Sequence, residues 1–134
     1  MKVDFTVPGQ PVAKQRPRKG ALGQFYTPAR TMRYEKDVAA AYLAAGGPKH
    51  PDYIGPVEMS ITLTRPYPTS WPKWRRNPIA ATAKPDVDNL AKSVADALNG
   101  IAYYDDAQIA YLSVSKEWGI EWSLRVIIET DDAE

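Results

Sequence analysis

The chain has 134 residues, of which 44% are hydrophobic and 25% charged, a composition typical of one globular domain. The absence of cysteine excludes disulfides and zinc–thiolate sites. The single histidine, His50, lies in a turn-like Gly- and Pro-rich segment, which argues against histidine-based catalytic triads. No apolar run reaches the roughly 18 residues of a membrane span and no signal-peptide core is present, so we expect a cytoplasmic protein that does not span a membrane.

Charge is unevenly distributed along the chain, although the formal net charge is only +1 at pH 7. Residues 10–20 and 65–92 are mainly basic. After residue 101 the balance reverses, with eight acidic residues and only two basic ones. Basic segments around an acidic centre suit a polyanion that is held over a metal site.

The first third of the chain predicts a strand, a basic loop and a helix. Residues 1–7 alternate between polar and apolar side chains, as a half-buried strand does. The basic loop at residues 10–23 would usually be solvated surface, but its spacing suggests an extended segment that follows phosphate groups. Its candidate DNA-binding residues are Lys14, Arg16 and Arg18. Thr27 and Pro28 then predict the start of a helix that runs to about Ala45.

A second strand and a long irregular segment follow. Residues 57–64 alternate cleanly and predict a strand. A loop as long as residues 65–83 is usually functional or disordered in a small domain. Its tryptophans, Trp71 and Trp74, either stack on unpaired bases or anchor the loop on the core, and the sequence leaves both readings open. The candidate DNA-binding residues here are Lys73, Trp74, Arg75, Arg76 and Lys84.

Residues 84–108 carry most of the chemistry that the sequence offers. Asp86 follows a proline and predicts a helix start, where its carboxylate would accept from free backbone N–H groups, and Gly100 predicts the end of this helix. The helix climbs roughly 20 Å, and an extended antiparallel return over residues 101–106 covers about the same distance. We therefore expect two acidic pairs to lie side by side. The four carboxylates are Asp86, Asp88, Asp105 and Asp106.

Such a group of carboxylates repels itself unless a cation is bound. Ligands that are all oxygen favour Mg²⁺ or Mn²⁺ over zinc, and Mg²⁺ completes its shell with waters and phosphate oxygens. The pattern indicates metal-assisted phosphodiester hydrolysis. Taken alone, however, D-x-D followed by an acidic turn is most often a helix cap and a solvated turn.

The last part of the chain predicts two more strands. Residues 108–116 have apolar side chains on both faces, which is compatible with a central strand, and residues 121–129 alternate. Residues 118–120 between them predict a hairpin. The whole order predicts a single α+β domain over residues 1–134, in which two main helices cover a mixed β-sheet.

Five short stretches carry a resemblance to a known family. They are KPDVDNLAK at residues 84–92, DALNG at residues 96–100 and YDDAQI at residues 104–109, preceded by KQRPR at residues 14–18 and YTP at residues 26–28. This order of motifs resembles the RusA family of Holliday junction resolvases from about Val7 to about Trp118.

The resemblance implies an endodeoxyribonuclease that resolves four-way DNA junctions as a symmetric homodimer with Mg²⁺ or Mn²⁺. It places the catalytic, metal-binding aspartates at Asp86, Asp88 and Asp106 and the essential lysine at Lys92, with Asp105 as a second-rank neighbour. Lys92 could act as a cation or as a proton shuttle, and the adjacent carboxylates favour the cation. A noncatalytic DNA-binding module and a metal-dependent nuclease for another branched DNA structure stay open as alternatives.

Overall fold

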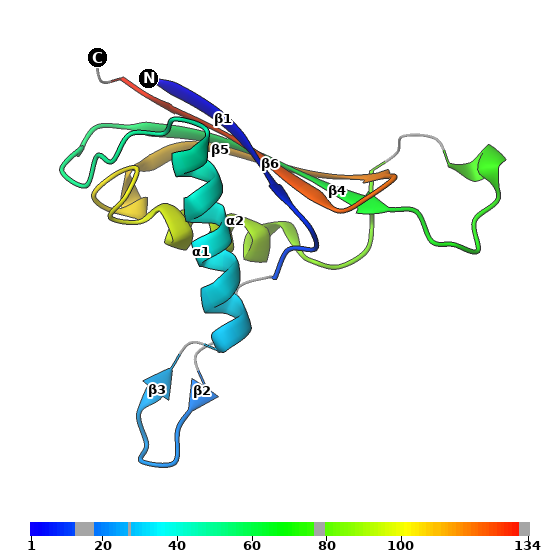
Figure 1. Cartoon of the computed structure of the whole chain (residues 1–134), viewed down its shortest axis with the longest axis horizontal. Helices are drawn as coiled ribbons and strands as arrows, with labels where there is room; N and C mark the ends of the chain where they lie inside the picture. The colour runs from blue at the N-terminus through cyan, green and yellow to red at the C-terminus, as the bar shows by residue number, and fades with distance from the viewer. Residues whose placement is uncertain (13–17, 27, 77–79, 132–134) are drawn as a thin grey trace.

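A computed structural model describes residues 1–12, 18–26, 28–76 and 80–131 of the chain, and Figure 1 shows its elements. In chain order these are β1 (Lys2–Pro8), β2 (Arg18–Lys19), β3 (Phe25–Tyr26), α1 (Ala29–Ala44), β4 (Val57–Pro66), the 3₁₀ helix η1 (Lys73–Arg75), α2 (Val87–Leu98), the 3₁₀ helix η2 (Asp106–Gln108), β5 (Ile109–Gly119) and β6 (Ser123–Thr130). The predicted α+β class, with a mixed sheet and two main helices, is confirmed. Within the described residues, no helix is long and apolar enough to cross a membrane.

Four strands form the main sheet in the order β1-β6-β4-β5. Strand β4 pairs in parallel with β5 and antiparallel with β6, which in turn pairs antiparallel with β1. Two predictions are therefore wrong. Strand β5 lies at an edge rather than in the centre, and β5 and β6 form no hairpin because β4 lies between them. Apolar residues on both faces of β5 did not indicate a central position, because Tyr111 and Leu112 are 68% and 50% exposed.

One face of the sheet forms the core with both helices. Alternate side chains of β1, β4 and β6 are buried against α1 and α2, and Figure 1 shows the two helices together on this side of the sheet. The core includes Val3, Phe5, Val7, Met59, Ile61, Leu63, Leu124, Val126 and Ile128 from the strands and Tyr34, Val38, Tyr42, Leu90, Val94 and Leu98 from the helices. This burial confirms the alternating strands predicted near residues 1–7 and 57–64.

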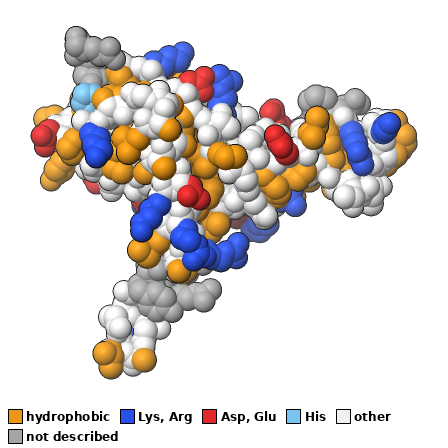
Figure 2. Space-filling view, in the orientation of Figure 1, with side chains coloured by type: hydrophobic (Ala, Val, Ile, Leu, Met, Phe, Trp, Pro, Cys, Tyr) orange, Lys and Arg blue, Asp and Glu red, His pale blue; other side chains and the backbone are white. Residues whose placement is uncertain are grey.

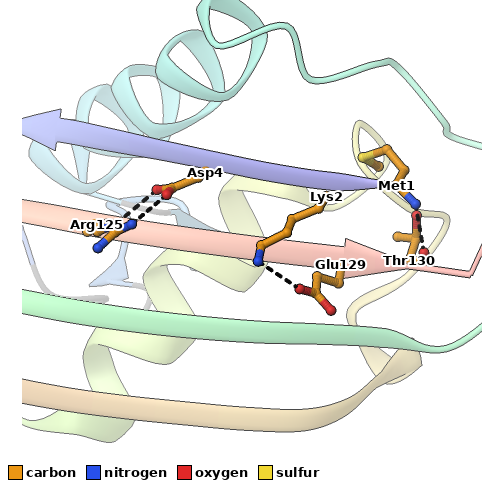
Figure 3. A network of polar contacts seen from close by, with 6 residues as sticks. All are labelled: Met1, Lys2, Asp4, Arg125, Glu129 and Thr130. Atoms are coloured by element: carbon orange, nitrogen blue, oxygen red, sulfur yellow. Dashed lines mark hydrogen bonds and ion pairs between the residues drawn. The ribbon is translucent and has the colours of Figure 1, made fainter.

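The opposite face of the sheet is polar, and Figure 3 shows part of it where β1 meets β6. Asp4 receives two hydrogen bonds from the Arg125 guanidinium, at 3.0 and 2.6 Å, and Lys2 Nζ lies 3.4 Å from Glu129 Oε1. The Met1 ammonium donates to the Thr130 carbonyl at 2.9 Å. Because exposed ion pairs contribute little stability, these contacts mainly favour one register of the outer strand pair.

The N-terminal region differs from its prediction in two details. Helix α1 begins at Ala29, one residue later than predicted, with Pro28 as the N-cap, while Thr27 lies outside the described residues. Strands β2 and β3 pair antiparallel within what was predicted to be a loop, and Figure 1 shows this hairpin projecting from the helix layer. Each strand has only two residues, so neither was long enough to give an alternating pattern.

Candidate active site

Helix α2 positions the first group of candidate residues. It spans Val87–Leu98 with Asp86 as its N-cap, so its predicted start is confirmed, and Gly100 follows it with a positive φ of 74°. Leu90 is fully buried beneath the helix, whereas Asp88 is exposed in the first turn. The apolar face thus directs the acidic and basic residues of α2 away from the core. Val87, predicted to belong to the apolar face, is 43% exposed.

The Asp86 side chain differs from its predicted role as a helix cap. Its carboxylate accepts no capping hydrogen bond from the backbone, and its two oxygens each lie 3.0 Å from Lys84 Nζ. A full positive charge two residues away attracts the carboxylate more strongly than neutral N–H donors do. The Asp86 side chain is 47% exposed, so it is accessible to a ligand from solvent.

Residues 101–106 return the chain toward α2 without the predicted antiparallel strand. They form a turn in which Ala102 and Tyr103 are fully buried, and the Tyr103 hydroxyl donates to the Ala95 carbonyl at 2.7 Å. Burial raises the pKa of Tyr103, so this hydroxyl keeps its proton at neutral pH. A buried aromatic side chain, rather than a ladder of strand hydrogen bonds, therefore fixes the return to Asp106.

Asp105 and Gln108 hold the short helix η2 on which Asp106 lies. The Ala107 N–H donates to Asp105 Oδ2 at 3.1 Å, and the Asp105 N–H donates to Gln108 Oε1 at 2.7 Å. The Gln108 amide also donates to the carbonyls of Tyr53 and Gly55 at 2.7 and 2.9 Å. Asp105 thus caps η2. A direct role for Asp105 in catalysis stays a prediction, ranked below those for Asp86, Asp88 and Asp106.

Lys92 connects α2 to the returning segment. Its ammonium lies 3.1 Å from Asp96 Oδ1 and 3.6 Å from Asp106 Oδ2. The hydrogen bond to Asp96 and the charge of Asp96 raise the pKa of Lys92 most, burial opposes them, and Asp106 adds a smaller increase. Lys92 is therefore a cation at neutral pH, which is the state that the sequence favoured.

Asp88, Lys92 and Asp106 line one cavity of about 410 Å³ between α2 and the start of β5. Its apolar wall is formed by Ala91, Ala95, Ile109 and Leu112. Asp86 does not line this cavity, and within the described residues no three His, Cys, Asp or Glu side chains gather closely enough to hold a metal ion. The fold thus brings together two of the predicted ligands with Lys92, while Asp86 pairs with Lys84 at the helix start.

The donor chemistry of this cavity nevertheless fits a hard divalent cation. Asp88 and Asp106 supply carboxylate oxygens, and the wall contains no imidazole or thiol. Mg²⁺ typically binds one or two protein carboxylates and keeps several waters, so it does not need a closed cage of protein ligands. A hard cation could therefore bind between Asp88 and Asp106, with Asp86 as a further candidate.

Residues 67–76, which follow β4 and include η1, form a segment that we call the arm. Its two tryptophans have different positions, with Trp71 before η1 and Trp74 within it. The Trp71 ring packs on Trp118 with 5.0 Å between centroids, and the Arg75 guanidinium lies 4.0 Å from the centroid of Trp71. Trp74, in contrast, is 78% exposed. Trp71 therefore anchors the loop on the domain, whereas Trp74 is presented to solvent. Figure 2 shows Lys and Arg side chains at the tip of this arm, which Figure 1 traces through η1.

The N-terminal candidates for DNA binding lie beyond what the structure describes. Lys14 and Arg16 fall outside the described residues, as does the side chain of Arg18. Their assignment stays a prediction. Leu22 and Phe25 of the adjoining hairpin are 91% and 72% exposed.

The sequence interpretation gave no role to Arg65 and Lys116, although both contact the segment that leads into α2. Arg65 donates to the Lys84 carbonyl, and Lys116 donates to the carbonyls of Ala83 and Pro85. One signal for Lys116 was available. It lies two residues after Val114 and two before Trp118, on the strand face that otherwise points toward the helices.

Two comparisons relate the chain to known proteins. The family model described as endodeoxyribonuclease RusA matches residues 8–129. The uncharacterized protein YqaN of Bacillus subtilis (strain 168) is 36% identical over 139 aligned residues, which cover 94% of each chain. The family match includes all the candidate catalytic residues and both basic segments.

Proposed function

Because the chain belongs to the RusA endodeoxyribonuclease family, we propose that it resolves Holliday junctions by metal-dependent hydrolysis of phosphodiester bonds in DNA recombination and repair. The observation that carries this proposal is the shared cavity of Asp88, Lys92 and Asp106, which lies within the matched residues. Two carboxylates that can bind a metal ion, next to the positive charge of Lys92, suit an active site at which a phosphate group reacts.

In this proposal Asp86, Asp88 and Asp106 hold Mg²⁺ or Mn²⁺. A bound ion would supply Lewis-acid chemistry, lowering the pKa of a water and neutralising charge on the leaving oxygen. Lys92 supplies a second positive charge to the transition state, and its contact with Asp96 at 3.1 Å keeps the ammonium in place. Its raised pKa supports a role as a cation rather than as a proton shuttle.

Lys84 connects substrate binding to the state of Asp86. Its side chain is 83% exposed, and its ammonium lies 3.0 Å from the Asp86 carboxylate. A DNA phosphate that binds Lys84 takes the place of this carboxylate as the partner of the ammonium. This exchange makes Asp86 easier to recruit to a cation held by Asp88 and Asp106. Without DNA, the divalent cation itself competes with the Lys84 ammonium for the Asp86 carboxylate.

The arm with Lys73, Trp74, Arg75 and Arg76 binds the branched substrate. The exposed Trp74 ring is available to stack on a base that is unpaired at the branch point. The cations of η1 contact the neighbouring phosphates. Packing of Trp71 on Trp118 holds the base of the arm against β5.

The two edges of the sheet support assembly of a homodimer through β5. Strand β1, at one edge, carries Lys2, Asp4 and Pro8, which are the kinds of residue that prevent strands from pairing with other chains. Residues 109–115 of β5 contain no charged residue. Beyond them, Ala81 covers the edge, since its N–H donates to the Lys116 carbonyl at 3.0 Å.

A second copy of the chain fits this uncharged part of β5. Antiparallel pairing of two β5 strands places a two-fold axis perpendicular to the joined sheet. Both helix layers then lie on the same side of the sheet, and so do both cavities. This arrangement suits a four-way junction, in which two matching strands are cut symmetrically.

Substitutions at the two edges test the dimer. Tyr111→Lys replaces a 68% exposed ring on β5 with a charge and should convert the dimer to a monomer in light-scattering measurements. Thr6→Lys, on the edge strand β1, is the matched control and should leave the mass unchanged. A dimeric Tyr111→Lys variant would exclude β5 as the interface.

The nuclease activity is tested with a synthetic four-way junction in which each strand is labelled in turn. We expect paired, symmetric nicks with Mg²⁺, and none with Asp88→Asn, although this variant should still bind the junction in EDTA. Cleavage by Asp88→Asn would contradict the site. Binding without cleavage by the wild-type protein would support a noncatalytic module, and faster cleavage of flaps or forks would support a nuclease for another branched structure.

A further inference from the structure

Two cations from the sheet bind three consecutive backbone carbonyls directly before Asp86. The Lys116 ammonium donates to the Ala83 carbonyl at 2.7 Å and to the Pro85 carbonyl at 2.9 Å. The Arg65 guanidinium donates to the Lys84 carbonyl that lies between them. We call Arg65 and Lys116 the carbonyl clamp.

Lys116 holds this segment through its main chain as well as its side chain. It pairs with Leu63 in the sheet, and Leu63 is fully buried on the helix side, so Lys116 extends toward the start of α2. Its own carbonyl accepts from the Ala81 N–H at 3.0 Å. Within the described residues it forms no ion pair, and its ammonium binds these two carbonyls of the segment.

Arg65 is held between two aromatic rings. Its guanidinium carbon lies 5.5 Å from the centroid of Trp118 and 4.8 Å from that of Trp122. Its Nε is buried without a hydrogen-bond partner within the described residues, which is a cost to folding. Arg65 as a whole is only half-buried, but an unpaired buried donor on a cation is unfavourable for stability alone, and this cost points to a role at the neighbouring site.

We propose that Lys116 and Arg65 are positioning residues that fix the entry into α2, and so keep Asp86 where it can join the metal site. This inference rests on the proposed function. The clamp binds the main chain at residues 83–85, and Asp86 is the next residue. Lys84, with its carbonyl fixed by Arg65, keeps its ammonium in solvent and 3.0 Å from Asp86.

The clamp is separable from the folding of α2. The helix is anchored by Leu90, Val94 and Leu98, which are all fully buried. Asp86 precedes the first helical residue and has extended backbone angles, so the packing of this face does not fix it directly. Loss of the clamp should therefore loosen the position of Asp86 more than it destabilises the domain.

The test compares Lys116→Met with Lys116→Arg in the full-length protein. Met keeps most of the side-chain volume but donates no hydrogen bond, whereas Arg keeps the charge and the donors. Binding of Mn²⁺ is measured by electron paramagnetic resonance of the free ion, without DNA. The Mg²⁺ concentration for half-maximal junction cleavage, junction binding in EDTA and thermal unfolding are measured alongside. Lys49→Met, at an exposed loop residue, is the matched control.

We expect Lys116→Met to weaken Mn²⁺ binding by about tenfold or more and to raise the half-saturating Mg²⁺ concentration similarly. Lys116→Arg should recover much of this loss, and junction binding in EDTA should not change. Unchanged Mn²⁺ affinity in Lys116→Met would overturn the clamp even if Asp88→Asn abolishes cleavage. If wild-type protein binds Mn²⁺ but cuts no branched DNA, the proposed function fails while the metal measurement still decides on the clamp.

Arg65→Met provides the second variant. It removes one of the three carbonyl contacts and keeps an apolar side chain between the two tryptophan rings. If Lys116→Met does not fold, a weaker Mn²⁺ affinity in folded Arg65→Met supports the clamp, and a wild-type affinity overturns it.

Discussion

The two sides of the candidate active site are held in place by different forces. On the return side, Asp106 is fixed by core packing of Tyr103 and by the hydrogen bonds of Gln108. On the entry side, Asp86 is half exposed, pairs with Lys84 and follows a segment that two cations hold by its carbonyls. The return side is thus part of the folded core, whereas the entry side can respond to metal and DNA.

The largest effect should come from removing a carboxylate on either side. Asp106→Asn and Asp86→Asn are nearly isosteric, and each should reduce junction cleavage by about 10³-fold or more, because a neutral amide is a poor ligand for a hard cation. Single-turnover cleavage at saturating protein measures this. Full activity of Asp86→Asn would contradict the assignment of Asp86, and with it the entry side, to the active site.

Lys92 tests the return side without removing a carboxylate. Lys92→Met should slow cleavage about 10²-fold and leave junction binding nearly unchanged, because the charge acts mainly in the transition state. The raised pKa of Lys92 keeps its ammonium protonated up to pH values above the ordinary lysine range. Wild-type and Lys92→Met proteins should therefore have pH–rate profiles of the same shape between about pH 6 and 9. An alkaline limb that disappears in Lys92→Met would support the proton-shuttle role instead.

The two tryptophans of the arm sharpen the comparison on the entry side. Trp74→Ala should weaken junction binding about tenfold with no change in the melting temperature, since its ring is 78% exposed. Trp71→Ala should lower the melting temperature, because its ring packs on Trp118. A lower melting temperature for Trp74→Ala would indicate that this ring too supports the fold.

The smallest effect is predicted for Tyr103→Phe on the return side. This change removes the hydrogen bond to the Ala95 carbonyl and should lower the free energy of unfolding by about 1–2 kcal/mol, as urea denaturation would measure. Mn²⁺ affinity should stay within about twofold of the wild type at temperatures where the variant is folded. Lys116→Met should do the opposite, with weaker metal binding and little change in stability. Loss of metal affinity in Tyr103→Phe would show that the two sides are coupled.

The elements that the sequence predicted correctly are those with local causes. Helix α2 has a proline and an aspartate before its start, an apolar period of 3.6 residues and a glycine after its end, so its bounds followed from adjacent residues. Strand β4 alternates over its whole predicted length, and its alternate residues are buried. Of the two acidic pairs expected side by side, Asp88 and Asp106 line one cavity, whereas Asp86 pairs with Lys84 and Asp105 caps η2.

The sequence-based predictions are wrong where contacts between residues far apart in sequence determine the local structure. The pattern of apolar residues along β5 could not show whether this strand lies at an edge or in the centre of the sheet. Its position depends on the order in which the strands pair, which is β1-β6-β4-β5. The extended return over residues 101–106 is replaced by a turn because Ala102 and Tyr103 bury themselves in the core. The carbonyl clamp joins residues more than 18 apart in sequence. The position of Lys116 on the helix-facing side of its strand was a local signal, but it did not indicate which carbonyls the ammonium would contact.

The pairing of β1 with β6 has a consequence for how the protein forms during translation. Lys2 lies opposite Glu129 and Pro8 opposite Ser123, and β6 is the strand that pairs with β1 in the main sheet. Strand β1 therefore gains its partner in the main sheet only after β6, far later in the chain, has left the ribosome. Contacts of such wide sequence separation slow folding, and nascent chains stalled before residue 123 should lack the completed sheet.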